Sequence, residues 1–243
     1  MSGHSKWKNI MHKKEKTDAQ RAKVFTKIGK EISIAVKAGG PDPVSNTKLK
    51  DLIYKAKSKN VPNDKIYSII KKAASDDGEA YEEIVYEGYG PSGIAVIVET
   101  TTDNRNRTGA DLRHYFDKFG GNLGTTGCVS FMFESKGIIV IESAKASEDA
   151  VMEAALNAGA LDFVVDEGAY EIYTDPADLD AVKEELASAG FEYISAEVEK
   201  VPSTYVTLTD EESITKMNRL LEMLDENEDV INVWHNWENP DED

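Results

Sequence analysis

The residues best suited to do chemistry are lysines concentrated near the N-terminus. Residues 1–72 contain 18 Lys and Arg against 6 Asp and Glu, a formal net charge of +12. Residues 73–243 contain 10 Lys and Arg against 39 Asp and Glu, a formal net charge of −29. Such asymmetry is typical of a protein that binds a polyanion with its basic part. The alternative is that lysine-rich helices only solvate a small bundle, and a charge of +12 favours binding.

The first 16 residues have no apolar periodicity and are expected to form a mobile arm that becomes ordered on binding. Trp7 stands between two lysines. It either stacks on an unpaired base or packs on the neighbouring helices, and the sequence leaves both open. The candidate nucleic-acid-binding residues of the arm are Lys6, Trp7, Lys8, Lys13, Lys14 and Lys16.

The arm leads into a predicted amphipathic helix. Thr17 to Gln20 form a T-x-x-Q capping box, and Gly39-Gly40-Pro41 ends the helix. At 100° per residue, one side is apolar, with Phe25, Ile28, Ile32, Ala35 and Val36. The opposite side is almost purely cationic. Its candidate phosphate-binding residues, together with Arg21, are Lys23, Lys27, Lys30 and Lys37.

Two further amphipathic helices follow Ser45 and Asn63 and complete a predicted three-helix bundle near residue 74. Their apolar residues are Leu49, Leu52, Ile53 and Ala56 in the first, and Ile66, Ile69 and Ile70 in the second.

The rest of the chain alternates strands and helices. Expected strands are Ile84–Glu87, Ile94–Thr100, Val129–Phe133, Ile138–Glu142, Phe163–Asp166, Tyr170–Thr174, Tyr193–Val198, Tyr205–Leu208 and Val230–Trp234. Expected helices are Arg105–Phe119, Ser147–Ala158, Leu179–Ala189 and Glu211–Glu226.

Residues 136–200 have the ferredoxin-like order strand-helix-strand-strand-helix-strand. When that block is removed, the predicted elements from Ile94 to Phe133 and from Tyr205 to Trp234 have the same strand-helix-strand-strand-helix-strand order. We therefore predict a multidomain α and α+β fold: an N-terminal three-helix bundle and two ferredoxin-like α+β domains, one inserted in the other. The predicted domains are 1–79 for the basic helical domain with its arm (1–16), 80–135 with 201–243 for the split domain, and 136–200 for the inserted domain.

No motif predicts catalysis. Gly88 to Gly93 match G-x-G-x-x-G, but Pro91 interrupts the motif and a strand-like run follows, so we interpret it as a hairpin connection. Cys128 has no local base partner, and the four histidines are scattered. We therefore expect no enzyme activity, no cofactor and no metal site.

Two other segments are candidate secondary sites. Arg105 and Arg107 fall in the first turns of a predicted helix, where free backbone N–H groups and guanidiniums suit phosphate. Pairing of both arginines with nearby acids is an equally good interpretation. Gly120, Gly121 and Asn122 begin a glycine-rich loop that either approaches a ligand closely or simply connects two elements.

The sequence favours a cytoplasmic protein. It has one cysteine, no apolar run long enough to span a membrane, and no apolar segment of a secretory signal near the N-terminus. We expect no membrane partner and infer no small-molecule substrate.

The chain resembles the YebC family. The resemblance is carried by GHSKWKNIMHKKEKTDAQRAKVFTKIGKEI, VYEGYGP, TTDNRNRT and GGNLG with GCVSFMFE, and it extends over essentially the whole length. The family is similar in architecture, with a helical N-terminal domain and two α+β domains. The resemblance implies DNA-binding transcriptional regulation in the cytoplasm. It also implies a second possibility, because a mitochondrial branch activates translation and bacterial relatives are linked to ribosomes stalled at proline-rich sequences.

Together these observations predict a non-enzymatic nucleic-acid-binding regulator of gene expression, a DNA-binding transcriptional regulator of the YebC type. The alternative is a ribosome-associated translation factor that binds ribosomal RNA or tRNA and relieves stalling. Lysines act as point charges on phosphate and carry little sequence information, which favours the RNA-binding alternative. The family resemblance favours DNA.

Overall fold

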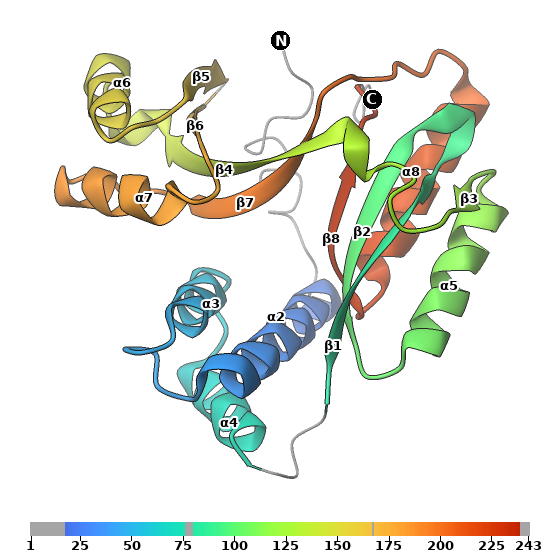
Figure 1. The fold of residues 1–243 in the computed structure, drawn as a ribbon, viewed down its shortest axis with the longest axis horizontal. Helices are drawn as coiled ribbons and strands as arrows, with labels where there is room; N and C mark the ends of the chain where they lie inside the picture. The colour runs from blue at the N-terminus through green and yellow to red at the C-terminus, as the bar shows by residue number, and fades with distance from the viewer. Residues whose placement is uncertain (1–17, 76–79, 167, 239–243) are drawn as a thin grey trace. The chain divides into compact units, whose positions relative to one another are not determined.

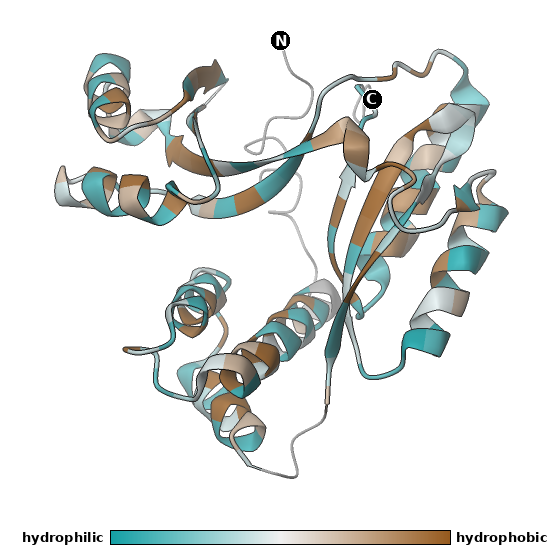
Figure 2. Ribbon diagram, in the orientation of Figure 1, coloured by the Kyte–Doolittle hydropathy of each residue, from teal (hydrophilic) through white to brown (hydrophobic). Residues whose placement is uncertain are grey.

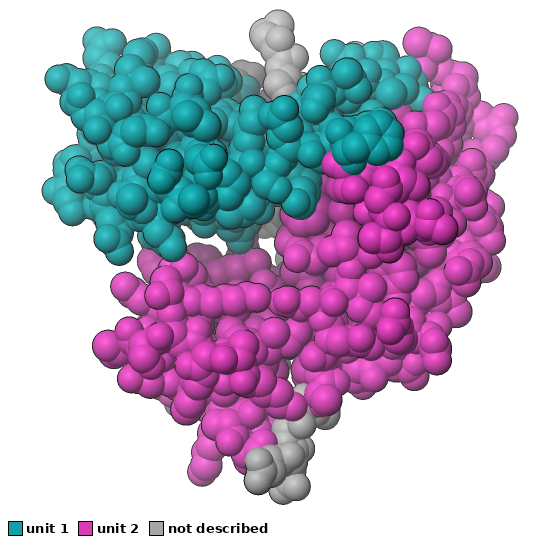
Figure 3. Space-filling model, viewed as in Figure 1, with its two compact units in different colours: residues 1–15, 131–208, 236–243 teal, residues 16–130, 209–235 magenta. Residues whose placement is uncertain are grey.

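The structure is a computed structural model that describes residues 18–75, 80–166 and 168–238. Within these ranges it contains seven α-helices and two four-stranded sheets (Figure 1). The predictions for residues 1–17, including the arm and the start of the capping box, lie outside the described residues. The described chain divides into two compact units (Figure 3): 131–208 with 236–238, and 18–130 with 209–235.

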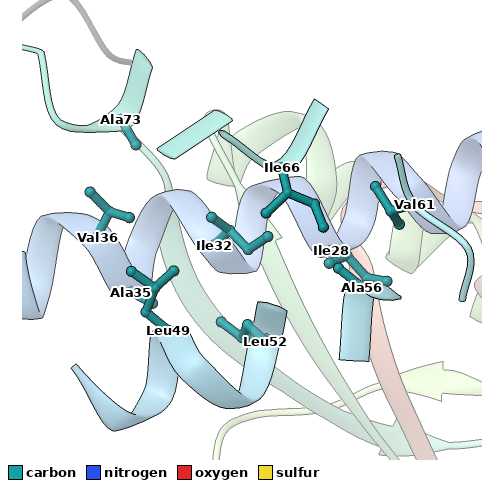
Figure 4. Close-up of a cluster of buried hydrophobic side chains, with 10 residues drawn as sticks. All are labelled: Ile28, Ile32, Ala35, Val36, Leu49, Leu52, Ala56, Val61, Ile66 and Ala73. Carbon is teal, nitrogen blue, oxygen red and sulfur yellow. The ribbon is translucent and has the colours of Figure 1, made fainter. Parts of the chain in front are cut away.

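The N-terminal helices form the predicted bundle. Helix α2 (Asp18–Gly39) packs against α3 (Thr47–Ser58) and α4 (Asn63–Ala73). Most of the predicted apolar residues point into one core (Figure 4), because a 3.6-residue period places them on one side of each helix. This core consists of Ile28, Ile32, Ala35, Val36, Leu49, Leu52, Ala56, Val61, Ile66 and Ala73. The predicted apolar residues Phe25, Ile53, Ile69 and Ile70 are partly buried and pack against it.

Asn46 joins the first two helices. Its side-chain oxygen accepts a hydrogen bond from Leu49 N at 3.0 Å and caps α3. Its amide nitrogen donates to the carbonyl oxygens of Ala35 and Gly40, each at 2.8 Å. Gly40 has a φ of +87°, so the chain leaves α2 in the left-handed region. One buried side chain therefore satisfies backbone groups at the end of α2 and at the start of α3.

The sheet of the same unit has the order β3-β1-β2-β8, and its strand pairs are antiparallel. The strands are β1 (Glu82–Tyr89), β2 (Ala95–Thr102), β3 (Asn122–Leu123) and β8 (Val230–His235). Helices α5 (Arg105–Lys118) and α8 (Glu211–Glu226) contact each other and pack on this sheet. β2 is a central strand because it pairs with both β1 and β8. Its first half is hydrophobic (Figure 2) and buried.

The G-x-G-x-x-G segment connects β1 and β2, which confirms its interpretation as a hairpin connection. The two strands pair from Glu82↔Thr102 to Tyr89↔Ala95, with a 3₁₀ turn at Pro91–Gly93 between them. The motif leads into a strand rather than a helix, so it lacks the helix N-terminus that a dinucleotide-binding loop requires.

Two of the predicted strands are wrong. Residues 129–132 lie in a loop and a 3₁₀ turn (Ser130–Met132), and β4 begins only at Phe133. Tyr205–Leu208 contains a single bridge, from Val206 to Trp237. The two strands that pair with β2 are β1 and β8, so neither Val129–Phe133 nor Tyr205–Leu208 contributes a strand next to it. The ferredoxin-like order is therefore incorrect for this sheet, because alternating apolar residues do not reveal which strands pair.

The other unit has the predicted ferredoxin-like element order. It runs β4 (Phe133–Glu142), α6 (Glu148–Asn157), β5 (Asp162–Asp166), β6 (Ala169–Thr174), α7 (Leu179–Ser188) and β7 (Ser195–Pro202). A short 3₁₀ turn, Ser143–Lys145, follows β4. The antiparallel sheet has the order β5-β6-β4-β7.

Helices α6 and α7 cover one face of that sheet. Ile139 and Ile172 point toward Val151 and Val182 of the helices, whereas the alternate residues Ile138 and Val140 belong to a second cluster. The proposed division into three domains, with boundaries at 79/80, 135/136 and 200/201, stays a prediction. Among the described helices, none is both long and apolar enough to cross a membrane.

We expect Asn46→Ala to lower the free energy of unfolding by about 2 kcal/mol, because it removes a helix cap and leaves two carbonyl groups without their donor. Urea unfolding followed by circular dichroism measures the change. Ser45→Ala is the matched control: it removes one exposed hydrogen bond to Asp42 O and should cost less than about 0.5 kcal/mol. Equal losses in the two variants would contradict the role of Asn46.

Candidate nucleic-acid interface

The predicted cationic side of α2 is not uniformly open to solvent. Arg21 and Lys37 are exposed, whereas Lys23 and Lys27 are half-buried. Lys30 is only 9% exposed. The candidate residues of the arm, Lys6, Trp7, Lys8, Lys13, Lys14 and Lys16, lie outside the described residues. The structure therefore leaves only part of the α2 row available to a large ligand.

Lys27 binds the last turn of α8, and Lys30 binds the segment that connects α8 to β8. The Lys30 ammonium lies 2.5 Å from Asp229 Oδ1 and 3.1 Å from the carbonyl oxygen of Glu228. The Lys27 ammonium donates to the carbonyl oxygen of Asp225 at 2.6 Å. The prediction that Lys30 binds phosphate is therefore corrected, because its buried charge is neutralised within the fold. No local sequence pattern predicts this pair, since Lys30 and Asp229 are 199 residues apart.

The side chain of Asp229, directly before β8, accepts hydrogen bonds from three elements. Its Oδ2 accepts from Arg107 at 2.8 Å and Thr108 Oγ1 at 2.7 Å, both on α5, and from Thr102 Oγ1 at 3.3 Å on β2. Its Oδ1 accepts from Lys30 on α2. Asp229 itself is 4% exposed. A buried carboxylate with two cationic and two hydroxyl donors is well compensated, so the fold holds it as an anion.

These contacts determine how Asp229 titrates. Burial acts to raise the pKa of the Asp229 carboxyl, but hydrogen bonds from Lys30, Arg107 and Thr108 outweigh it and bring the pKa to about 2. The same carboxylate, together with Asp103, raises the pKa of the Arg107 guanidinium through hydrogen bonds. The Asp229 carboxyl and the Arg107 guanidinium are therefore both charged at neutral pH.

The two arginines at the start of α5 behave differently. Arg107 lies 2.8 Å from both Asp103 Oδ1 and Asp229 Oδ2, so the interpretation that it pairs with nearby acids is the one observed. Arg105 is exposed, and its guanidinium makes no hydrogen bond or ion pair with any described residue. Of the two candidates, only Arg105 has a guanidinium that the described fold does not use.

The candidate loop residues have structural roles. Gly120 has a φ of +79° directly after α5, where a residue with a side chain would be strained. Gly121 is crowded, because a Cβ there would lie 2.4 Å from Tyr89 O. Asn122 pairs with Tyr89 in the sheet. These contacts favour the interpretation of the first three loop residues as a connection.

The rest of this loop is held by Glu87, a buried carboxylate on β1. It accepts hydrogen bonds from the backbone N–H groups of Gly127, Val129 and Ser130 at 2.8, 2.9 and 2.8 Å. Burial acts to raise the pKa of Glu87, but these three donors outweigh it and the pKa lies below its ordinary value. Burial and the nearby Glu87 charge raise the pKa of the Cys128 thiol, which keeps it protonated at neutral pH.

Helices α3 and α4 carry exposed lysines that were not among the candidates. Lys48 forms an ion pair with Glu83 at 3.0 Å, and Lys55 is half-buried beside Glu31. The exposed lysines of this surface are Lys48, Lys50, Lys57, Lys59, Lys65, Lys71 and Lys72. At 100° per residue these lysines fall outside the apolar stripes of α3 and α4, mostly on their flanks, so this signal was present in the sequence.

Comparisons with known proteins cover nearly the whole chain. Residues 5–76 match the family model described as TACO1/YebC protein N-terminal domain, and residues 81–237 match the model described as TACO1/YebC second and third domain. A "Probable transcriptional regulatory protein" of Acetivibrio thermocellus is 60% identical over 239 residues, which are 98% of this chain and 99% of that protein. One of the same name from Caldicellulosiruptor bescii is 57% identical over 244 residues, covering 100% of both.

A solved structure has the same fold. The crystal structure of a conserved hypothetical protein from Aquifex aeolicus matches with a TM-score of 0.85 and 45% sequence identity. The match covers 93% of this chain and 94% of that chain.

We expect Asp229→Asn to destabilise the protein in a pH-dependent way. The folded pKa of about 2 lies below the ordinary 3.8, so the unfolded state takes up the proton first as pH falls. The resulting contribution, about 2 kcal/mol, is fully present above about pH 5 and is lost as pH falls toward 2. Urea unfolding at several pH values measures the free energy of unfolding of wild type and variant. The difference between the two should become smaller as the pH falls from about 5 toward 2.

Asp103→Asn is the control, since it removes an exposed partner of the same arginine and should cost less than about 1 kcal/mol at any pH. If the difference in free energy of unfolding between wild type and Asp229→Asn stays constant between pH 7 and pH 2.5, the ionised carboxylate is not the source of the stability.

Proposed function

Because this chain belongs to the TACO1/YebC family, we propose that it regulates gene expression by binding nucleic acid through its basic helical end. The names of its relatives describe probable transcriptional regulators and support a regulatory role. They support the absence of an enzymatic role as well, since neither names a reaction. The observation that carries the proposal is the distribution of charge.

The helical bundle has a net positive charge, and most of its lysines on α3 and α4 are exposed to solvent. Residues 18–75 contain 13 Lys and Arg against 5 Asp and Glu, a formal net charge of +8. Seven of these lysines are exposed in α3 and α4 or directly after α3. Phosphates neutralised by lysines release bound counterions, which provides binding free energy independent of sequence. The arm adds five lysines before α2 and extends the same proposed interface.

The proposed interface differs in one respect from the row of lysines along α2. Lys30 holds Asp229 and is left out of it, and Lys27 contributes less because it donates to the Asp225 carbonyl. Arg21, Lys23 and Lys37 remain candidates, with the lysines of α3 and α4 beside them. The binding surface thus includes the bundle's second and third helices.

The acidic remainder of the chain restricts which nucleic acids can bind. Residues 73–243 carry −29, so a polyanion that approaches this part is repelled. A target must present phosphates to the bundle without approaching the rest of the chain. This repulsion contributes selectivity without any base contact.

The first candidate function is DNA-binding transcriptional regulation in the cytoplasm. The relatives' name, "Probable transcriptional regulatory protein", supports the transcriptional part of this candidate. The second is ribosome-associated translational control through ribosomal RNA or tRNA. The composition of the surface favours the second candidate: Arg21 is the one arginine among residues 1–72, and lysines alone read bases poorly. The two candidates share the electrostatic surface and differ in the target.

We expect binding to weaken steeply with salt. If about 6 phosphates of duplex DNA are neutralised, the slope of log K against log salt concentration is about −5. Fluorescence anisotropy with a labelled oligonucleotide between 50 and 300 mM salt measures this slope. A slope near zero would contradict the electrostatic mechanism.

Replacing Lys57, Lys59 and Lys72 by Gln should make the slope shallower by about 2 to 3, because each removed phosphate contact lowers it by nearly one. The matched control replaces three lysines of the other unit, Lys136, Lys145 and Lys200. The first two form ion pairs with glutamates, and Lys200 donates to Ser135 Oγ. This control changes the net charge equally and should leave the slope unchanged. Equal effects would indicate that net charge alone governs binding.

The DNA and RNA candidates are separated by crosslinking the protein in cells and sequencing bound DNA and bound RNA together. Enrichment of promoter fragments supports transcriptional regulation. Enrichment of ribosomal RNA or tRNA, with co-sedimentation on ribosomes, supports translational control. Recovery of neither above a mock control would reject both.

A further inference from the structure

Helix α5 carries two arginines that the described fold leaves unused. Arg105 and Arg113 are both exposed, and neither guanidinium makes a hydrogen bond or ion pair with any described residue. The other two arginines after residue 80, Arg107 and Arg219, are paired with carboxylates. Acids are abundant in this part of the chain, so a shortage of carboxylates does not explain the two open guanidiniums.

The two arginines flank one point on the helix surface. Each stands four residues from Gly109, about 6 Å along the helix axis, and the two are about 80° apart around it. Gly109 faces Tyr86 of β1, because a Cβ there would lie 3.4 Å from the Tyr86 hydroxyl oxygen. That hydroxyl donates to the carbonyl oxygen of Arg105 at 3.2 Å. Burial raises the pKa of the Tyr86 hydroxyl, and the charges of both arginines oppose this shift, so both guanidiniums lie near one ring.

The start of α5 lies beside the basic helix α2. Arg107 of α5 and Lys30 of α2 bind the two oxygens of the same Asp229 carboxylate, at 2.8 and 2.5 Å. Arg105 stands two residues before Arg107, in the first turn of α5. The described residues of the bundle and of α5 belong to one compact unit. The surface formed by Arg105, Tyr86 and Arg113 therefore begins next to the lysine row of α2.

Carboxylates also border this surface. Asp117 stands four residues after Arg113, and the charge of Glu82 acts on the Tyr86 hydroxyl. In the described chain no ion pair joins either acid to Arg105 or Arg113. These acids weaken the long-range attraction for a polyanion. Binding at this surface therefore depends on direct contact with the guanidiniums rather than on net charge.

Two guanidiniums in this arrangement suit a phosphate backbone. The planar fork of arginine can donate two parallel hydrogen bonds to the oxygens of one phosphate. The two helix positions are about 12 Å apart along the axis, and phosphates recur about every 3.4 Å of axial rise along a strand of DNA. One strand can therefore reach both arginines. The position beside α2 favours nucleic acid as the ligand, because a strand bound at the bundle can continue along α5.

We propose that Arg105 and Arg113 bind the phosphate backbone of the nucleic acid that the helical bundle holds. The proposal rests on the proposed function and extends its interface from the bundle onto α5. It also identifies one place where the acidic part of the chain accepts a polyanion. There the two direct contacts offset the repulsion that the surrounding carboxylates exert.

The test measures binding of the full chain to a labelled DNA duplex and a labelled RNA of equal length, by fluorescence anisotropy over a range of salt concentrations. One variant combines Arg105→Gln with Arg113→Gln. A second combines Arg105→Lys with Arg113→Lys and keeps the charge. The matched control combines Lys216→Gln with Arg219→Gln on α8, because these two cations belong to the same unit and are already paired with glutamates.

The glutamine variant should bind about tenfold more weakly, and its slope of log K against log salt concentration should be shallower by about 2, because two phosphate contacts are lost. The lysine variant should keep the slope but lose part of the affinity, since a point charge replaces the fork. The control should bind within about twofold of wild type. Thermal unfolding should be the same for all variants of α5, because both arginines are exposed.

Three outcomes would overturn the proposal. If the glutamine variant binds like the control, the arginines do not contact nucleic acid. If it instead loses only the binding of a labelled polyglutamate peptide, the surface takes an acidic protein segment. If it unfolds at a lower temperature, the arginines act within the fold. In each case a steep salt slope of the wild type still supports the proposed function, whereas wild-type binding to neither nucleic acid rejects both proposals.

Discussion

The buried carboxylate of Asp229 is the interaction on which this arrangement depends. It contacts Lys30 of α2, Thr102 of β2, and Arg107 and Thr108 of α5, so one side chain connects the helical bundle to the sheet beside it. A carboxylate removed from water is costly unless cations and donors surround it, and removing one partner leaves the others uncompensated. The strand pairing places it there: the register of β2 and β8 shifts between Glu99 and Thr100, and Thr101 N donates to Asp229 O.

This constraint divides the basic residues into two groups with different roles. Lys30 and Arg107 neutralise Asp229, and Lys27 binds a carbonyl oxygen near it, so these charges are used within the fold. The ammonium groups of the exposed lysines Lys50, Lys57 and Lys71 make no hydrogen bond or ion pair with any described residue. A formal count of charge treats both groups alike, although the charges used within the fold are not available to phosphates. The proposed interface therefore centres on α3 and α4 as much as on α2.

Much of the architecture could be predicted from local patterns. The three helices of the bundle follow from their 3.6-residue apolar period, and the element order of β4 to β7 follows from alternating strand and helix signals. The incorrect predictions are the strands expected at Val129–Phe133 and Tyr205–Leu208, because whether a segment is a strand depends on its pairing with another strand. Val129 is apolar and fully buried, yet it sits in a loop that Glu87 holds through three backbone N–H groups. A buried loop of this kind has the same composition as a strand, and only the position of Glu87 distinguishes them.

The sequence by itself determined the charge asymmetry, the apolar faces of the helices and the motifs of the family, because these depend on residues close together in the chain. The tertiary structure decided which charges remain available. Lys30 and Asp229 are 199 residues apart, and no local pattern shows that they meet. Burial and pairing are properties of contacts between distant segments, so they alone separate a lysine that holds the fold together from one that is open to a phosphate.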